Sequence, residues 1–387
     1  MNINIEFFDK EPIENIVTCL NFKMDKVIFF GQKDGMTCEA KEITETALRD
    51  ICDISDISFV ELSMKDIDRV LQVITSTVQR EEQQGGKCFF DLTGGADMAL
   101  VAMGMYSASH NIPMHRYDIV EGELKILNTK AMWIDQCVES RQIPLTIDDL
   151  IRLHGGKVDY TMQKESKDNL SDPDTRRDVE KIWQIAGPNM RKWNGFSAAL
   201  KTARQPGNKT DTEEISREKI CKSVGIGRPL EDENVFMDYL NALRASGCIE
   251  NLRKDSQWIS FRYGSNTVRG CLLEAGCILE LHTYYERVES GLYDGCKIGT
   301  HLKWGLNSRD EGYLVGNEID VLLLRGYVLT FISCKGGDVD QMDLYELDTV
   351  ASRFGGKYAR RELVTANPLE THHDQRAEEM NITVICV

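Results

Sequence analysis

The sequence predicts two α/β domains with a connector between them. The amino-terminal domain, residues 1–150, is expected to be doubly wound and Rossmann-like, and the carboxy-terminal domain, residues 266–387, to be a second α/β unit. Three observations predict this. Strand-like runs alternate with amphipathic helices in the first domain, a strand, strand, helix, strand pattern occupies the last one, and a length of 387 residues allows two or three domains.

Five short apolar runs predict a parallel sheet in the first domain, covered by helices on both faces. The helix between the third and fourth runs is the clearest, because apolar residues recur at helical spacing from Ile67 to Val78. Sheets of this kind bind ligands beyond the carboxyl ends of their strands, where the chain turns into a helix. The runs are Ile3 to Phe8, Lys26 to Gly31, Ile57 to Leu62, Cys88 to Leu92 and Met114 to Ile119.

The turn after the fourth run is a candidate ligand site. It reads Asp91-Leu92-Thr93-Gly94-Gly95-Ala96-Asp97-Met98 and leads from a buried strand into a helix. Its glycines let backbone N–H groups approach an anion, Thr93 adds a hydroxyl and the helix N-terminus adds positive dipole character, so we expect a phosphate. The alternative is that the glycines only make a tight turn. The segment is neither a Walker A loop nor a GxGxxG fingerprint.

The last domain contains a predicted hairpin with charged residues at its ends. The first strand begins with Asn317-Glu318-Ile319-Asp320, the second ends with Ile332-Ser333-Cys334-Lys335, and Arg325-Gly326 is the turn. Asp320 and Lys335 should therefore meet near one end of the pair. Carboxylates are the ligands that Mg²⁺ or Mn²⁺ prefers, and an ammonium can orient water or stabilise charge on a phosphate. The alternative is that these charges only solvate strand ends.

A helix and a further strand follow the hairpin. Apolar residues from Leu344 to Phe354 fall on one helix face, Gly355-Gly356 ends the helix, and Leu363 to Thr365 is strand-like. This completes the strand, strand, helix, strand order of the last domain.

The hairpin resembles that of the PD-(D/E)xK restriction-endonuclease-like nucleases. Asp320 matches the motif aspartate and Lys335 the motif lysine, whereas Ser333 stands where an acidic residue or glutamine is usual. Ser333 is a poorer metal ligand, so the resemblance implies that another acid completes the site. The candidates are Glu318, Asp338 and Glu274, of which Glu274 fits the first acidic position of the fold. The implied metal ligands are Asp320, Glu318 and Glu274.

The turn after the fourth strand resembles the Thr-Gly-Gly-Thr-Lys-Met segment of the CARF domain, the CRISPR-associated Rossmann fold that binds cyclic oligoadenylates across a homodimer interface. Ala96 and Asp97 replace the usual Thr and Lys, which removes a positive charge near the expected phosphate. Three side chains on neighbouring turns and strands are suited to phosphate or base edges. They are Lys10, Gln32 and Arg116.

A CARF-like half joined to a nuclease-like half resembles the standalone CARF nucleases of type III CRISPR defence, whose members carry Asn-Glu-(Leu/Ile)-Asp-Val before a strand that ends in (Glu/Ser)-Cys-Lys. The resemblance implies a homodimer that is activated by a cyclic oligoadenylate, cyclic tetra-adenylate in particular. It also implies a Mn²⁺- or Mg²⁺-dependent cut in single-stranded DNA or RNA, with nicking of duplex DNA included. A ligand can cause such a shift only if it prefers one conformation over the other.

Composition limits the alternatives. The net charge of -16 argues against a broad nucleic-acid-coating surface. The twelve cysteines contain no Cys-x-x-Cys and are expected to be reduced thiols, and no cysteine near His372-His373 supports a zinc site. The sequence contains no long apolar run and no signal region at its start, so we expect a cytoplasmic protein without a membrane partner.

The connector, residues 151–265, leaves two rival functions open. A helix from Phe236 to Leu243 precedes two strand-like pieces, Cys248 to Leu252 and Trp258 to Tyr263, which is consistent with a winged helix or with a part of the nuclease domain. One rival is a catalytically silent sensor of cyclic oligoadenylate, in which Ser333 marks a decayed nuclease. The other is a CARF-type transcription regulator that binds duplex DNA through the connector.

Overall fold

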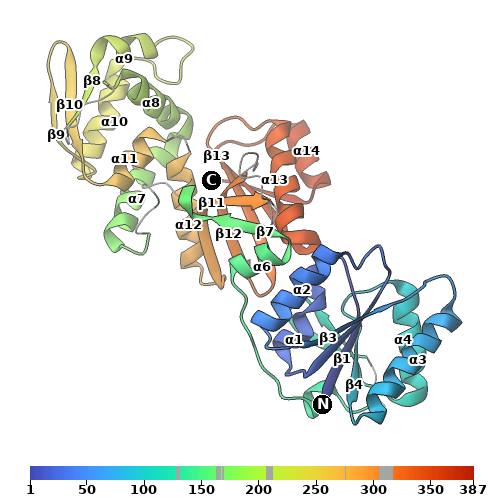
Figure 1. The fold of residues 1–387 in the computed structure, drawn as a ribbon. Helices are drawn as coiled ribbons and strands as arrows, with labels where there is room; N and C mark the ends of the chain where they lie inside the picture. Colours follow the sequence, from blue (N-terminus) through green and yellow to red (C-terminus); the bar gives the residue numbers. More distant parts are fainter. Residues whose placement is uncertain (128–130, 163–166, 168–169, 206–211, 275, 305–316) are drawn as a thin grey trace.

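A computed structural model of the chain describes residues 1–387 except 128–130, 163–166, 168–169, 206–211, 275 and 305–316. It contains three sheets in three lobes that follow one another in space (Figure 1). We call them the amino-terminal lobe (residues 1–126), the middle lobe (173–273) and the carboxy-terminal lobe (277–387 together with 147–159). The carboxy-terminal lobe lies between the other two.

The amino-terminal lobe is a doubly wound sheet with the strand order β3-β2-β1-β4-β5-β6. The five predicted strands are confirmed, and each bound lies within one residue of the predicted one. They run parallel, and the short edge strand β6, which was not predicted, pairs antiparallel with β5. The strands are β1 (Asn2–Phe7), β2 (Lys26–Gly31), β3 (Asp56–Glu61), β4 (Lys87–Asp91), β5 (Met114–Asp118) and β6 (Glu123–Ile126).

Helices cover both faces of this sheet, and most of the side chains between the layers are apolar. Ile3, Ile5 and Ile28 pack under α3 (Ile67–Gln83) and α4 (Asp97–His110). The opposite face packs under η1 (Pro12–Asn15), α1 (Val17–Asn21) and α2 (Cys38–Asp50). The strand order reverses between β1 and β4, so the turns after these two strands meet at the crevice where such sheets bind ligands.

The carboxy-terminal lobe is a mixed sheet with the order β15-β14-β13-β12-β11-β7. The predicted hairpin is β12 and β13, and the predicted helix and strand are α13 and β14. Helices α13 and α14 cover one face and α12 the other, which is why Val321 to Leu324 are all buried. The elements are α12 (Cys277–Glu289), β11 (Gly295–Trp304), β12 (Asn317–Arg325), β13 (Val328–Lys335), α13 (Gln341–Gly355), η5 (Gly356–Tyr358), β14 (Arg360–Thr365), α14 (Thr371–Glu379) and β15 (Ile382–Cys386).

The middle lobe follows the order helix, strand, helix, helix, strand, strand from α8 to β10, with the sheet order β8-β10-β9. This is the arrangement of a winged helix, one of the two alternatives for the connector. Its elements are α7 (Pro173–Ala186), η4 (Gly187–Asn189), α8 (Met190–Ala203), β8 (Thr212–Ser216), α9 (Arg217–Ser223), α10 (Glu233–Ala245), β9 (Ile249–Lys254), β10 (Trp258–Tyr263) and α11 (Asn266–Leu273).

The expected connector, residues 151–265, does not form one unit. Its first part contains β7 (Gly156–Asp159), which pairs with β11 at the edge of the carboxy-terminal sheet, and η2 (Tyr160–Met162). The preceding helices are α5 (Ile134–Cys137) and α6 (Ile147–Leu153). Among the described residues, no helix is both long and apolar enough to cross a membrane.

Candidate active site and candidate ligand site

Asp320 and Lys335 lie at the same end of the β12–β13 pair, as the hairpin predicts. The last paired residues are Val321 and Ile332. Just beyond them, Asp320 Oδ2 accepts hydrogen bonds from the backbone N–H of Cys334 at 2.6 Å and from the Ser333 hydroxyl at 3.4 Å. The strand geometry therefore fixes the carboxylate of Asp320 against the end of β13.

Lys335 is held by the helix that follows it. Its Nζ lies 2.6 Å from Asp343 Oδ1, and the other oxygen of Asp343 accepts the backbone N–H of Asp340 in the capping box that begins α13. Burial alone would lower the pKa of Lys335, but the charges of Asp343 and Asp320 outweigh it and raise the pKa. Lys335 is therefore a positioned ammonium at the edge of the site.

A second carboxylate, Glu280, reaches this site from the first turn of α12. Burial first, and then the charge of Glu280, raise the pKa of Asp320 to about 7. Glu280 is itself buried. The sequence prediction missed it, although an acid between Leu279 and Leu281 in an apolar helix was a readable signal.

The remaining predicted acids occupy different positions. Glu318 lies two residues before Asp320 on β12, with Oε1 3.6 Å from Lys167 Nζ and Oε2 3.9 Å from His301 Nε2. Glu274 follows α11 as its C-cap, and its carbonyl accepts the N–H of Cys277. Asp338 is exposed before α13. The charge of Glu280 acts on Asp320 more strongly than the charge of any of these three acids.

A lysine from outside the hairpin completes the cluster. Lys167 Nζ forms an ion pair with Glu280 and lies 3.6 Å from Glu318 Oε1, and its side chain is 1% exposed. No local pattern marks this residue, because more than a hundred positions of the sequence separate it from both partners.

The donor types of this cluster suit a hard divalent cation, because carboxylate oxygens are the ligands that Mg²⁺ and Mn²⁺ prefer. Among the described residues, the ligand atoms of Asp320, Glu280 and Glu318 do not all lie within 4.8 Å of one another, so these three carboxylates are not gathered into a formed metal site in this structure. The raised pKa of Asp320 reflects crowding of negative charge in a buried place, which a cation relieves.

The candidate ligand site lies at the β1–β4 crevice, and its glycines contact the protein's own carboxylates. The N–H of Gly95 donates to Asp9 Oδ2 at 3.0 Å. A Cβ on Gly94 would lie 2.5 Å from Glu14 Oε2, and Gly95 has a φ of 135°. The turn therefore needs both glycines for its own packing.

Thr93 also serves the fold. It is buried, its hydroxyl donates to Asp91, and its oxygen accepts the N–H of Tyr117 at 2.9 Å. Four of the predicted ligand residues are exposed, whereas Gly94, Gly95, Ala96 and Met98 are partly buried. The exposed ones are Lys10, Gln32, Asp97 and Arg116.

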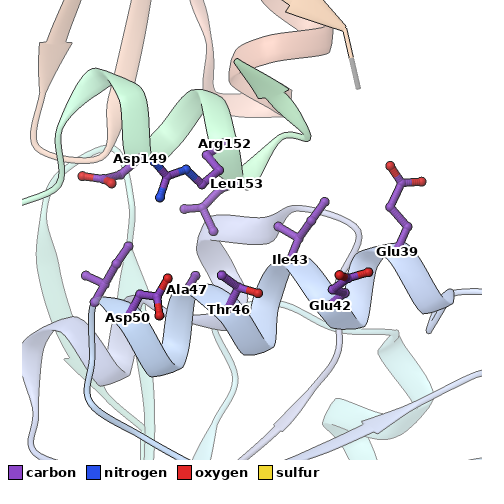
Figure 2. A pocket seen from close by; sticks show the side chains of 10 residues that line it. Glu39, Glu42, Ile43, Thr46, Ala47, Asp50, Asp149, Arg152 and Leu153 are labelled. Atoms are coloured by element: carbon purple, nitrogen blue, oxygen red, sulfur yellow. The ribbon is translucent and has the colours of Figure 1, made fainter. Parts of the chain in front are cut away.

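Two cavities adjoin the amino-terminal lobe. One of about 360 Å³ extends from the turn that carries Lys10 to Arg353 and Gly356 of the carboxy-terminal lobe. The other, of about 120 Å³, lies between α2 and α6, and Figure 2 shows Arg152 and Leu153 of α6 facing Ile43 and Ala47 of α2. The first cavity connects the candidate ligand site to the carboxy-terminal lobe.

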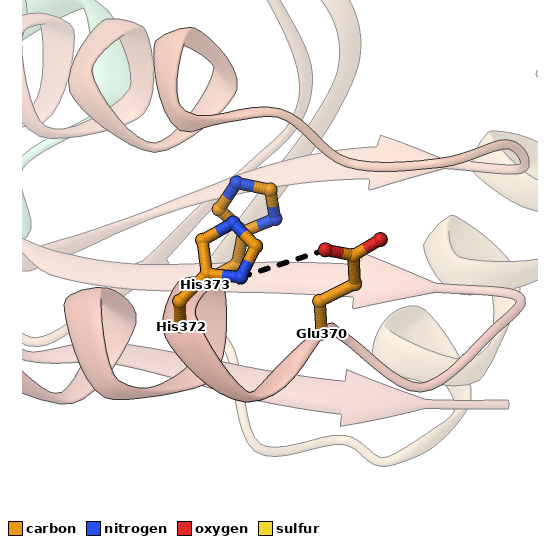
Figure 3. Close-up of side chains that lie close together, drawn as sticks. All are labelled: Glu370, His372 and His373. Carbon is orange, nitrogen blue, oxygen red and sulfur yellow. Dashed lines mark ion pairs between the residues drawn. The ribbon is translucent and has the colours of Figure 1, made fainter.

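A separate group of side chains that could bind a metal ion lies at the start of α14 (Figure 3). Glu370, His372 and His373 each offer a ligand atom, and these atoms lie within 4.8 Å of one another. Glu370 and His372 are exposed, with Oε2 and Nδ1 3.5 Å apart. A helix N-terminus favours anions over cations, so this group does not compete with the buried carboxylates as a metal site.

Comparison with known proteins gives the fold a context. No family model matches the sequence, and neither does any curated protein. The structure aligns with protein VC1899 from Vibrio cholerae with a TM-score of 0.73 and 16% identity, over 100% of this chain and 94% of that one. It also aligns with Can2 from Sulfobacillus thermosulfidooxidans, solved in complex with cyclic tetra-adenylate, with a TM-score of 0.68 and 15% identity, over 99% and 92%.

The chain has the fold of VC1899 and Can2. This confirms the predicted combination of an amino-terminal Rossmann-like unit and a carboxy-terminal α/β unit. The alignments span nearly the full length of both proteins, so the middle lobe is part of the shared architecture.

Proposed function

We propose that this chain is a cyclic-oligoadenylate-activated, metal-dependent endonuclease that cleaves single-stranded DNA or RNA in type III CRISPR defence, with nicking of duplex DNA included. The observation that carries the proposal is the convergence of Asp320, Glu280 and Lys335 at one end of the β12–β13 pair. Two buried carboxylates beside a positioned lysine are suited to phosphodiester hydrolysis.

Each residue has a distinct role in this proposal. Asp320 and Glu280 would hold the divalent cation, Mn²⁺ or Mg²⁺, with Glu318 nearby on β12. Such a cation would supply a bound water of lowered pKa and neutralise charge on the phosphate. Lys335 orients the attacking water and stabilises the developing negative charge, and its pairing with Asp343 fixes its position. Glu274 has no direct role in this arrangement.

The proposed activator is a cyclic oligoadenylate, cyclic tetra-adenylate in particular, bound by a homodimer. Support comes from the fold shared with Can2 and from the exposed side chains at the β1–β4 crevice. Asp9 already accepts a hydrogen bond from the N–H of Gly95. We therefore expect Lys10 and Arg116 to bind the phosphates of the activator more than the glycine turn does. Asp97 disfavours a phosphate at the start of α4.

The test is a cleavage assay on single-stranded DNA, single-stranded RNA and supercoiled plasmid, with each cyclic oligoadenylate and with Mn²⁺ or Mg²⁺. We expect cleavage that needs both the activator and the metal and that is lost in Asp320→Asn and Lys335→Ala. Lys303→Ala, which removes a lysine of β11 that is paired with Asp159 of β7, is the matched control and should cleave normally. Cleavage that survives Asp320→Asn would contradict the proposal.

Two rivals have distinct outcomes in the same preparation. A catalytically silent sensor binds the cyclic oligoadenylate and cleaves none of the three substrates. The winged-helix arrangement of the middle lobe favours the second rival, a transcription regulator. That rival predicts sequence-specific binding to duplex DNA that is unchanged by Asp320→Ala, and a gel-shift titration measures it.

A further inference from the structure

Lys167 is a buried cation inside the candidate metal site. Its ammonium forms an ion pair with Glu280 and lies 3.6 Å from Glu318 Oε1, while 1% of its side chain is exposed. Both partners belong to the set of carboxylates that would surround a divalent ion. Lys335, the other lysine of the site, is paired with Asp343, so Lys167 is the main positive charge next to Glu280.

The neighbouring strand is shaped to accommodate this side chain. Gly299 lies in β11 between Ile298 and Thr300, which pair with Val321 and Ile319, so it sits beside Asp320. Its φ is 56°, a conformation that favours glycine, and a Cβ there would lie 2.8 Å from Lys167 Nζ and 2.9 Å from its Cδ. A strand residue without a side chain therefore leaves the space that the lysine fills.

The electrostatics favour a charged lysine at this place. Glu280 and Glu318 both lie within ion-pair distance of this buried ammonium. Without a cation, buried like charges would repel one another at high energetic cost. The lysine thus performs the neutralisation that a divalent ion would otherwise perform.

We propose that Lys167 is a built-in counter-cation that occupies the charge position of the divalent ion, so that Mn²⁺ or Mg²⁺ enters fully only when the ammonium leaves Glu280. This rests on the proposed metal-dependent function. An ion held by Glu280 and Asp320 would lie within a few ångströms of the ammonium, and like charges in a poorly solvated site repel strongly. The resting protein is therefore held in a form that binds metal weakly.

The test measures Mn²⁺ binding to the full chain by calorimetry, without activator and without nucleic acid. We expect Lys167→Met to bind Mn²⁺ at least about tenfold more tightly than the wild type, because a repelling charge is removed. Lys157→Met, which removes an exposed lysine from β7, is the matched control and should bind as the wild type does. Equal or weaker binding by Lys167→Met would overturn the proposal.

Thermal melting adds a second readout. In EDTA, Lys167→Met should melt at a lower temperature than the wild type, since the substitution leaves carboxylates unneutralised. Addition of Mn²⁺ should raise the melting temperature of Lys167→Met far more than that of the wild type. If Lys167 were instead a group that acts on the phosphate, Lys167→Met would lose cleavage while its Mn²⁺ affinity stayed unchanged. That result would also overturn the proposal.

A measurement on the wild type covers the case in which Lys167→Met does not fold. Acetylation of lysines by an amine-reactive ester, read by mass spectrometry, should spare Lys167 in EDTA and modify it once Mn²⁺ saturates the protein. Protection that persists with Mn²⁺ bound would refute the displacement. Failure of the nuclease function is seen separately, as Mn²⁺ binding without cleavage in the activated wild type.

Discussion

Ser333 is the residue at which this site departs from the nuclease motif, and it can be converted back. Its hydroxyl lies 3.4 Å from Asp320 Oδ2, so a carboxylate at this position would join the same oxygen cluster. We expect Ser333→Glu to tighten Mn²⁺ binding by roughly tenfold, because ligand charge sets the affinity of such sites. Calorimetry measures the Mn²⁺ affinity, with Ser333→Ala as the control. A Ser333→Glu variant that binds no better than Ser333→Ala would show that position 333 lies outside the metal's reach.

The residues of the site differ in how far local sequence could predict them. Asp320, Ser333 and Lys335 follow from the alternation of side chains along two adjacent strands, which is a local rule. Glu280 and Lys167 come from other elements, and only tertiary packing brings them to β12. The prediction of Glu274 as the first acid followed from its place before an apolar helix, whereas the structure puts Glu280, six residues later, next to Asp320.

At the scale of elements, the start of α13 links stability to the position of Lys335. Asp340 caps this helix by accepting the N–H groups of Met342 and Asp343, and Asp343 completes the capping box. Asp340→Ala should lower the free energy of unfolding by about 1 kcal/mol, the usual loss for an N-cap. Urea denaturation measures it, and Met342→Ala, an exposed change in the same turn, should have almost no effect. Equal losses in both variants would contradict the role of the cap.

Local patterns predicted the elements that are long and apolar, and missed those that depend on distant partners. The β12–β13 hairpin and the five parallel strands have dense runs of apolar residues between clear turns. In contrast, β7 is four residues long and pairs with β11 far along the chain, so no local pattern assigns it to the carboxy-terminal sheet. The short edge strand β6 alternates polar and apolar residues over only four positions, too few for periodicity to register.

At the scale of the whole molecule, two glutamates connect the candidate ligand site to the carboxy-terminal lobe. Glu14 accepts a hydrogen bond from the Tyr358 hydroxyl and lies 2.8 Å from Lys357 Nζ, and Glu11 accepts the backbone N–H of Lys357 at 2.8 Å. Glu11 directly follows Lys10 in the turn after β1, and Glu14 lies in η1, which begins at Pro12. Lys357 and Tyr358 directly follow α13, whose other end holds Lys335 through Asp343.

This contact makes a testable link between ligand binding and cleavage. Tyr358→Phe removes one hydrogen bond between the lobes, so we expect the cyclic tetra-adenylate affinity to change little and the activated cleavage rate to fall about fivefold or more, the low end of allosteric coupling. Tyr345→Phe, on the exposed side of α13, is the matched control. Binding isotherms and cleavage rates on the same samples separate the two effects. A rate equal to that of the control would place the coupling elsewhere.

The same contact predicts how stability depends on pH. Burial first, and then the charge of Glu14, raise the pKa of Glu11 to about 7, against the opposing effect of the Lys357 N–H. The nearby His154 does not offset this, because burial and Arg353 lower its pKa to about 4 and keep it neutral. Glu11 Oε1 is also buried without a hydrogen-bond partner among the described residues, which favours the protonated form.

Because the folded protein holds the Glu11 proton more tightly than the unfolded chain does, this group destabilises the fold progressively as the pH rises from about 4.5 to about 7. This destabilisation lowers the free energy of unfolding by at most about 3 kcal/mol at pH 8. Glu11→Gln keeps an acceptor for the Lys357 N–H but cannot ionise, so its unfolding free energy should fall less steeply over that range. Urea denaturation at pH 5, 6, 7 and 8 gives both slopes. Parallel curves for the two proteins would mean that Glu11 stays ionised in the fold, and that Lys357 and its surroundings neutralise it more fully than their geometry indicates.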